Sequence, residues 1–214
     1  MTRYGAAELY GFDLASLAPQ QLRELSSAKH KEVACPFKRQ ESGKPQPTCS
    51  KKGGVCSLRQ YERDKAGNVT PSSLPTTTCP QRLLEANLIF EWVGETLLGT
   101  KIPAIISELP FLMGEGTTAD EEGDAVGMID KVLVNSAGDA LKWCALEMQA
   151  VYFSGKSMEN DFSVIRTWQG LGIPFQRVQR RPDFRSSGPK RLMPQLQIKV
   201  PTISRWGRKT VDTN

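Results

Sequence analysis

Residues 31–80 constrain the fold of this chain most, because they contain four of its five cysteines and few large apolar side chains. Pro, Gly, Ser, Thr and Lys dominate the segment, and such a composition buries too little apolar surface to fold without a cross-link or a metal. The segment therefore predicts a small unit near the N-terminus that is held together by a cross-link or a metal. Its cysteines, separated by 13, 6 and 22 residues, are Cys35, Cys49, Cys56 and Cys79.

Three interpretations of these cysteines stay open: a metal site, two disulfides, or a chance grouping. The N-terminal residues lack the apolar stretch of a secretory signal, and no run of about 18 apolar residues predicts a membrane span. We therefore expect a cytoplasmic protein that does not bind membranes. Thiols stay reduced there, which favours a closed, structural metal site with four thiolate ligands. Zinc and iron both accept four thiolates, so the residues do not choose between them.

The remainder of the chain predicts an α/β fold. Residues 1–30 indicate one or two short helices, with Pro19 in a first turn, and residues 80–99 have helical spacing from Pro80 to Gly99. We expect three domains, an N-terminal helical segment at 1–30, a metal-binding subdomain at 31–80 and a core at 81–214. Strand-like runs separated by Gly-rich or Asp-rich turns occupy 101–113, 127–136, 141–153 and 193–203.

The charge of the chain is unevenly distributed. Its formal net charge is +5, yet residues 166–214 hold eleven Lys or Arg against two Asp or Glu. A basic C-terminal segment on a mildly acidic body indicates a polyanionic partner, most simply nucleic acid, although an ordinary solvated tail is the alternative. The single histidine, His30, is expected on an exposed helix, which disfavours a Ser-His-Asp hydrolase.

The expected strand at 141–153 places Glu147 and Gln149 on one face, although the strand is apolar enough to lie in a core. A buried carboxylate is costly unless a partner offsets its charge. Asp130 lies between apolar residues on the expected strand at 127–136. In a meander this strand lies beside the one at 141–153. Two such carboxylates form an oxygen-rich pocket suited to Mg²⁺, which can polarise a phosphodiester. A solvated strand face is the alternative interpretation.

An ordered series of motifs accompanies this pattern. It runs "CPF … C … GVC … CP-x-R-x-L", then a helix, then "E-L-x-F", "I-D-K-V-L-V" and "L-E-M-Q-A-V-x-F-S-G". From about residue 4 to its end, the chain resembles the NotI-like type II restriction endonucleases. The resemblance implies a PD-(D/E)xK restriction-endonuclease-like core, a mixed sheet flanked by helices, with an N-terminal four-cysteine metal-binding subdomain. It also implies a homodimer that cleaves double-stranded DNA at a specific site in a Mg²⁺-dependent reaction.

The resemblance also implies roles for individual residues. Asp130 and Glu147 match metal-binding catalytic carboxylates, and Gln149 stands where most relatives in the wider nuclease class have lysine. Glu108 matches a further acidic active-site residue. Glutamine cannot deprotonate water, so the general base is left open between a metal-bound hydroxide, a substrate phosphate and a neighbouring carboxylate. The ligands of a structural, rubredoxin-like iron centre would be Cys35, Cys49, Cys56 and Cys79.

The basic C-terminal segment would then be the DNA-facing part, since Lys and Arg side chains contact phosphates and guanine edges. A solvated loop is again the alternative. The residues in question are Arg177, Arg180, Arg181, Arg185, Lys190 and Arg191.

NotI-like enzymes usually continue past the point where this chain ends, so either a C-terminal region has been lost or only part of the protein is present. Two functions follow. The first is a site-specific, Mg²⁺-dependent endonuclease, and the second is an inactive or truncated relative that acts as a metal-stapled DNA-binding protein.

Overall fold

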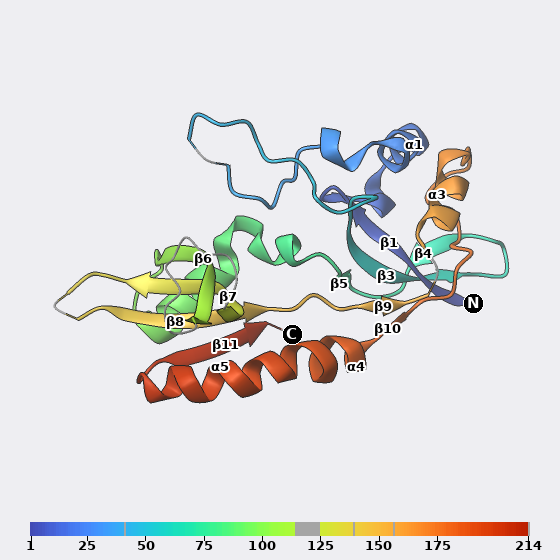
Figure 1. Ribbon diagram of the computed structural model, residues 1–214. Helices are drawn as coiled ribbons and strands as arrows, with labels where there is room; N and C mark the ends of the chain where they lie inside the picture. Colours follow the sequence, from blue (N-terminus) through green and yellow to red (C-terminus); the bar gives the residue numbers. More distant parts are fainter. Residues whose placement is uncertain (41, 114–124, 139, 156, 214) are drawn as a thin grey trace. The chain divides into compact units, whose positions relative to one another are not determined.

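The computed structural model describes residues 1–40, 42–113, 125–138, 140–155 and 157–213 (Figure 1). The chain divides into two compact units. The first comprises Met1–Ala86 and Ala150–Phe184, and the second comprises Asn87–Gln149 and Arg185–Asn214. Helices and strands occur in both units, so the fold is mixed α/β as the sequence predicts. In the ranges described, no helix is both long and apolar enough to cross a bilayer.

The first unit is built on an antiparallel sheet of order β2-β1-β3-β4, with β5 beside β3. The helices α1 and α3 contribute Leu22, Phe162 and Ile165 to its apolar core. A separate two-stranded pair joins β9 and β10. The elements are β1 (Thr2–Leu9), β2 (Phe12–Asp13), η1 (Leu14–Ser16), α1 (Pro19–Ser27), η2 (His30–Glu32), β3 (Val55–Arg63), β4 (Val69–Pro71), β5 (Thr76–Thr77), η3 (Pro80–Asn87), β9 (Phe153–Ser154), α3 (Glu159–Arg166) and β10 (Arg181–Pro182).

The N-terminal residues depart from the expected helices. Helix α1 does begin with Pro19 in its first turn, but Thr2–Leu9 form a strand, so the helical prediction is wrong there. The strand β1 pairs along its length with β3, from Thr2 opposite Glu62 to Leu9 opposite Val55. This pairing joins residues more than forty positions apart, which local sequence patterns do not reveal.

The second unit is built on a four-stranded sheet of order β11-β8-β7-β6, in which only the β11–β8 pair is parallel. Helices lie on both of its faces (Figure 1). On one, Asn135 of β7 donates a side-chain hydrogen bond to Leu98 O at 2.9 Å. On the other, Ile203 of α5 packs with Val132 and Ala145. The elements are α2 (Leu88–Val93), η4 (Gly94–Leu98), β6 (Ala104–Met113), β7 (Ala125–Asn135), β8 (Lys142–Met148), α4 (Phe184–Ser187), η5 (Gly188–Leu192), α5 (Met193–Arg205) and β11 (Lys209–Thr213).

Two further expectations need correction. The predicted helix at 80–99 ends at Gly99 as expected, but Ala86 (φ +50°) interrupts it. The predicted strand at 193–203 is wrong, because these residues form α5. The β-branched Ile198 and Val200, which indicated a strand, are partly exposed on the helix, whereas Ile203 is fully buried against the sheet.

Candidate active site

Asp130 and Glu147 come from neighbouring strands of the second unit. The β7–β8 ladder pairs Lys131 with Leu146, and Asp130 and Glu147 are the next positions along it. The Met148 N–H donates to Asp130 Oδ2 at 2.8 Å, so the Asp130 side chain bends over the end of β8. Glu147 is fully buried, whereas Asp130 is half-buried. The structure therefore brings the two predicted carboxylates together.

The Glu147 carboxylate is held in an environment that opposes its charge. Burial raises its pKa and the neighbouring Asp130 raises it further, while a hydrogen bond from Lys199 and the charge of that ammonium act in the opposite direction. Glu147 Oε2 accepts from Lys199 Nζ at 2.7 Å. Glu147 Oε1 is buried and has no hydrogen-bond partner among the described residues. Such an orphaned oxygen is costly, and a cation would satisfy it.

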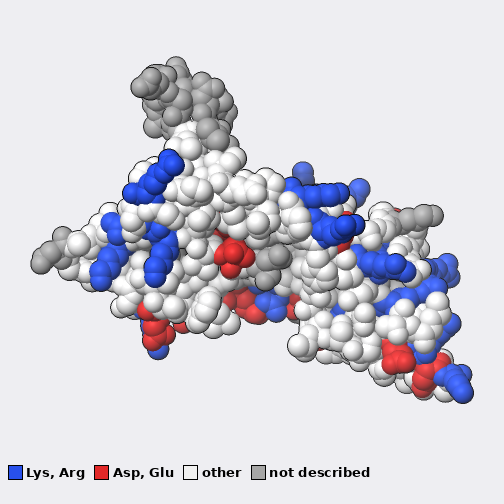
Figure 2. Space-filling view, turned by 90° about the horizontal axis from the view of Figure 1, so that it is seen from below, with Lys and Arg blue, Asp and Glu red and all other residues white. Residues whose placement is uncertain are grey.

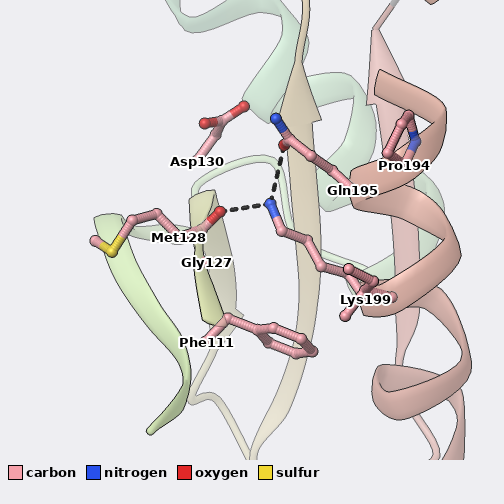
Figure 3. Close-up of a pocket in the computed structure, with 8 residues that line it drawn as sticks. Phe111, Gly127, Met128, Asp130, Pro194, Gln195 and Lys199 are labelled. Atoms are coloured by element: carbon pink, nitrogen blue, oxygen red, sulfur yellow. Dashed lines mark hydrogen bonds between the residues drawn. The ribbon is translucent and has the colours of Figure 1, made fainter. Parts of the chain in front are cut away.

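Lys199 is the side chain that the sequence argument missed. It lies on α5, and Figure 3 shows its ammonium between Met128 O and the Gln195 side chain. Beside it is a cavity of about 360 Å³ lined by Asp130, Lys199 and Gln195, together with Phe111, Gly127, Met128, Pro194 and Ile198. The sequence carries a signal that could have revealed Lys199, because Gln195, Lys199 and Ile203 are spaced four residues apart and so share one face of a helix.

Gln149 comes two residues after Glu147, and Glu108 lies on β6, the strand beside β7. Gln149 follows β8 directly, and its N–H donates to Thr213 O of β11 at 3.4 Å. In the β6–β7 register, Ser107 pairs with Lys131 and Leu109 with Ile129, which places Glu108 across from Asp130. Glu108 is exposed and has a positive φ of +55°, an uncommon backbone conformation for a non-glycine residue. Three acidic positions therefore lie in one row across β6, β7 and β8.

The four N-terminal cysteines belong to the first unit, and all are buried free thiols. A short antiparallel bridge between Ala34 and Thr48 joins the segments that carry Cys35 and Cys49. Cys79 lies beside Cys56, because its N–H donates to Cys56 O at 3.2 Å. The backbone thus arranges the cysteines as two pairs.

The cysteine pairs also influence each other electrostatically. Burial raises the pKa of the Cys56 thiol to about 12, and the nearby Cys79 and Cys49 contribute in the same direction. Burial likewise raises the pKa of Cys49, with contributions from Cys35 and Cys79. Ionising these thiols together is therefore unfavourable unless a cation offsets their charge. In the described ranges, no three or more His, Cys, Asp or Glu side chains are arranged as a metal-ligand set.

The six basic residues of the expected DNA-facing segment differ in their surroundings. Arg180 is buried, forms an ion pair with the buried Asp161, and donates to Ser157 O at 3.1 Å. The guanidinium of Arg180 is therefore held inside the first unit by protein acceptors, and its predicted DNA contact stays a prediction. Figure 2 shows separate groups of basic side chains on one face, with acidic ones between them. The exposed members of the segment are Arg177, Arg181, Arg185, Lys190 and Arg191.

Comparison with known proteins identifies one similarity. The sequence profile of a family described as "Restriction endonuclease NotI" matches residues 20–213. The match includes the four cysteines and the strands that carry Asp130 and Glu147. No curated protein and no solved structure matches the chain.

Proposed function

The chain belongs to the NotI restriction endonuclease family, whose members are type II, site-specific deoxyribonucleases, and we propose that it cleaves double-stranded DNA in a Mg²⁺-dependent reaction at Asp130 and Glu147. The observation that carries this proposal is the convergence of these two side chains from adjacent strands, together with the orphaned Glu147 Oε1. Carboxylate oxygens are the ligands that Mg²⁺ prefers.

The residues around this pair would divide the work of hydrolysis. When bound there, Mg²⁺ supplies Lewis-acid polarisation of the phosphodiester and favours ionisation of the attacking water. Asp130 and Glu147 would hold the ion, and Gln149 would orient the scissile phosphate or the water with its carboxamide. Glu108, across from Asp130, would add a further carboxylate at the exposed edge of the row.

We assign the DNA contacts to the exposed members of the basic segment rather than to Arg180. Exposed guanidinium and ammonium groups neutralise backbone phosphates, which positions a protein on duplex DNA. A homodimer would place one copy of the site on each strand, since two-fold symmetry in a protein matches a palindromic DNA sequence. The residues proposed for these contacts are Arg177, Arg181, Arg185, Lys190 and Arg191.

We further propose that the four N-terminal cysteines hold a structural iron or zinc ion, and that the PD-(D/E)xK core lies in the second unit. Support for the metal comes from the donor set of four buried thiols, among which burial and neighbouring cysteines raise the pKa of Cys49 and Cys56. Metal analysis of the purified protein tests this, with one ion per chain expected and thiolate-to-iron absorption if the ion is iron. A protein that folds with all four thiols free and no bound metal would contradict the assignment.

Cleavage of a panel of unmethylated bacterial genomic DNA tests the proposed reaction. We expect discrete fragments with Mg²⁺, none with EDTA, and none from Glu147→Ala although that variant still binds DNA. A matched control is Glu95→Gln, an exposed carboxylate of the same unit paired with Lys101 at the surface. A wild-type protein that binds DNA but never cuts it would instead support the inactive, DNA-binding alternative.

A further inference from the structure

Lys199 is a buried cation at the centre of the candidate site. Only 4% of its side chain is exposed, and its partner Glu147 is fully buried. An ammonium has three hydrogens to donate, and Lys199 Nζ finds three acceptors, Glu147 Oε2 at 2.7 Å, Gln195 Oε1 at 3.2 Å and Met128 O. Removing two charges from water has a large free-energy cost, and their mutual attraction need not recover it. A buried ion pair is therefore weak evidence that Lys199 serves stability alone.

The helix that carries Lys199 is anchored so that this side chain faces the sheet. Ile203, one turn later on the same stripe, is fully buried against Val132 and Ala145 of β7 and β8. Since residues four apart on a helix share a face, Lys199 is directed at the next position along β8, which is Glu147. Its placement therefore follows from the packing of α5 rather than from a flexible surface stem.

Gln149, two residues after Glu147 and directly after the end of β8, carries a neutral carboxamide instead of an ammonium. Gln149 can donate a hydrogen bond, but it brings no positive charge to a phosphate. The cavity beside the site is lined by both Lys199 and Asp130, so the ammonium and the half-buried carboxylate border the same space (Figure 3). Its volume of about 360 Å³ exceeds what a phosphate group needs.

We propose that Lys199 is a catalytic residue of this nuclease and supplies, from α5, the positive charge that Gln149, directly after β8, does not supply. The inference rests on the proposed function and deepens it. The role is electrostatic: a non-bridging oxygen of the scissile phosphate takes the place of Gln195 Oε1, which accepts from Lys199 Nζ at 3.2 Å, as negative charge develops there, and Lys199 neither forms nor breaks a covalent bond. A single group that stabilises negative charge developing in the transition state contributes about 100-fold to 1,000-fold to the rate.

The experiment compares Lys199→Met with the double variant Lys199→Met/Gln149→Lys, which moves the ammonium from the helix to the residue directly after β8. Rates are measured in single turnover with Mg²⁺ on the fragment that the genomic panel reveals. DNA affinity is measured in EDTA, and folding by urea unfolding without divalent ions. Arg205→Met removes an exposed cation from the same helix and is the matched control.

We expect Lys199→Met to cut about 100-fold more slowly than wild type with nearly unchanged DNA affinity, and the double variant to regain at least about tenfold. A merely structural lysine would not be rescued from position 149. If Lys199→Met does not fold, Lys199→Gln, which keeps hydrogen-bond donors without the charge, is expected to fold and to cut equally slowly. A folded Lys199→Met or Lys199→Gln that cuts at the wild-type rate, or a folded double variant no faster than its parent, overturns the assignment but leaves the proposed function standing. A wild type that cuts no DNA overturns both.

Discussion

The buried ion pair between Asp161 and Arg180 makes a sharp prediction about the first unit. Asp161, on the first turn of α3, is 1% exposed and also accepts from the backbone N–H groups of Arg177 at 3.1 Å and Val178 at 3.4 Å. The carboxylate thus fixes the segment 177–180 against α3. Asp161→Asn keeps the shape of the side chain, but it removes the negative charge and turns an amide N–H towards the guanidinium.

Breaking one partner of a buried pair costs about 3–5 kcal/mol, because the remaining charge stays buried. We therefore expect Asp161→Asn to lower the free energy of unfolding by about 3 kcal/mol. Urea unfolding measures this, and hydrogen exchange of peptides from residues 157–183 localises the loss. The matched control is Glu159→Gln on the same helix, whose ion pair with Arg166 is largely exposed and should leave stability near the wild-type value.

A loss for Asp161→Asn no larger than that of the Glu159→Gln control would refute the reasoning. It would mean that Arg180 relaxes to solvent at little cost, and the argument that removes it from the DNA contacts would then fail.

Two further substitutions test the packing of each unit by urea unfolding. Gly54→Ala is expected to destabilise the first unit by more than about 2 kcal/mol, since Gly54 has φ +65° and an added Cβ would lie 2.2 Å from the Tyr10 ring. The control Gly43→Ala, at φ +76° with open space around it, should lose only the free energy that its left-handed backbone conformation costs. Equal losses for the two variants would contradict this. Ile203→Ala should lower the free energy of unfolding by about 2–5 kcal/mol, because it leaves a cavity between α5 and the sheet. Ile198→Ala, at a half-exposed position of the same helix, should lower it far less. The reverse order would contradict the statement that the Ile203 face of α5 packs on the sheet.

Local patterns were sufficient to predict some elements. Pro19 at a helix start and Gly99 at a helix end act through their own backbone geometry, and both stand where expected. Apolar runs separated by Gly-rich or Asp-rich turns were similarly sufficient for β7 and β8. Asp130 and Glu147 could be expected to meet, because consecutive strands in a meander pair directly.

Elements that depend on distant partners were not predictable in this way. β1 is a strand because β3 pairs with it, and α5 is a helix although Ile198 and Val200 favour a strand. The error at α5 hid Lys199, whose direction towards Glu147 depends on helical spacing. The burial of Arg180 was not predictable for a related reason, since its partner Asp161 lies nineteen positions away.

An anomalous-scattering map from crystals of the protein grown with its DNA site and Mn²⁺, which replaces Mg²⁺ in such sites, tests the central claim most directly. The account predicts a Mn²⁺ peak about 2.1 Å from one oxygen of Asp130 and one of Glu147, beside a DNA phosphate. A well-ordered complex in which the metal peak lies away from both carboxylates would contradict it.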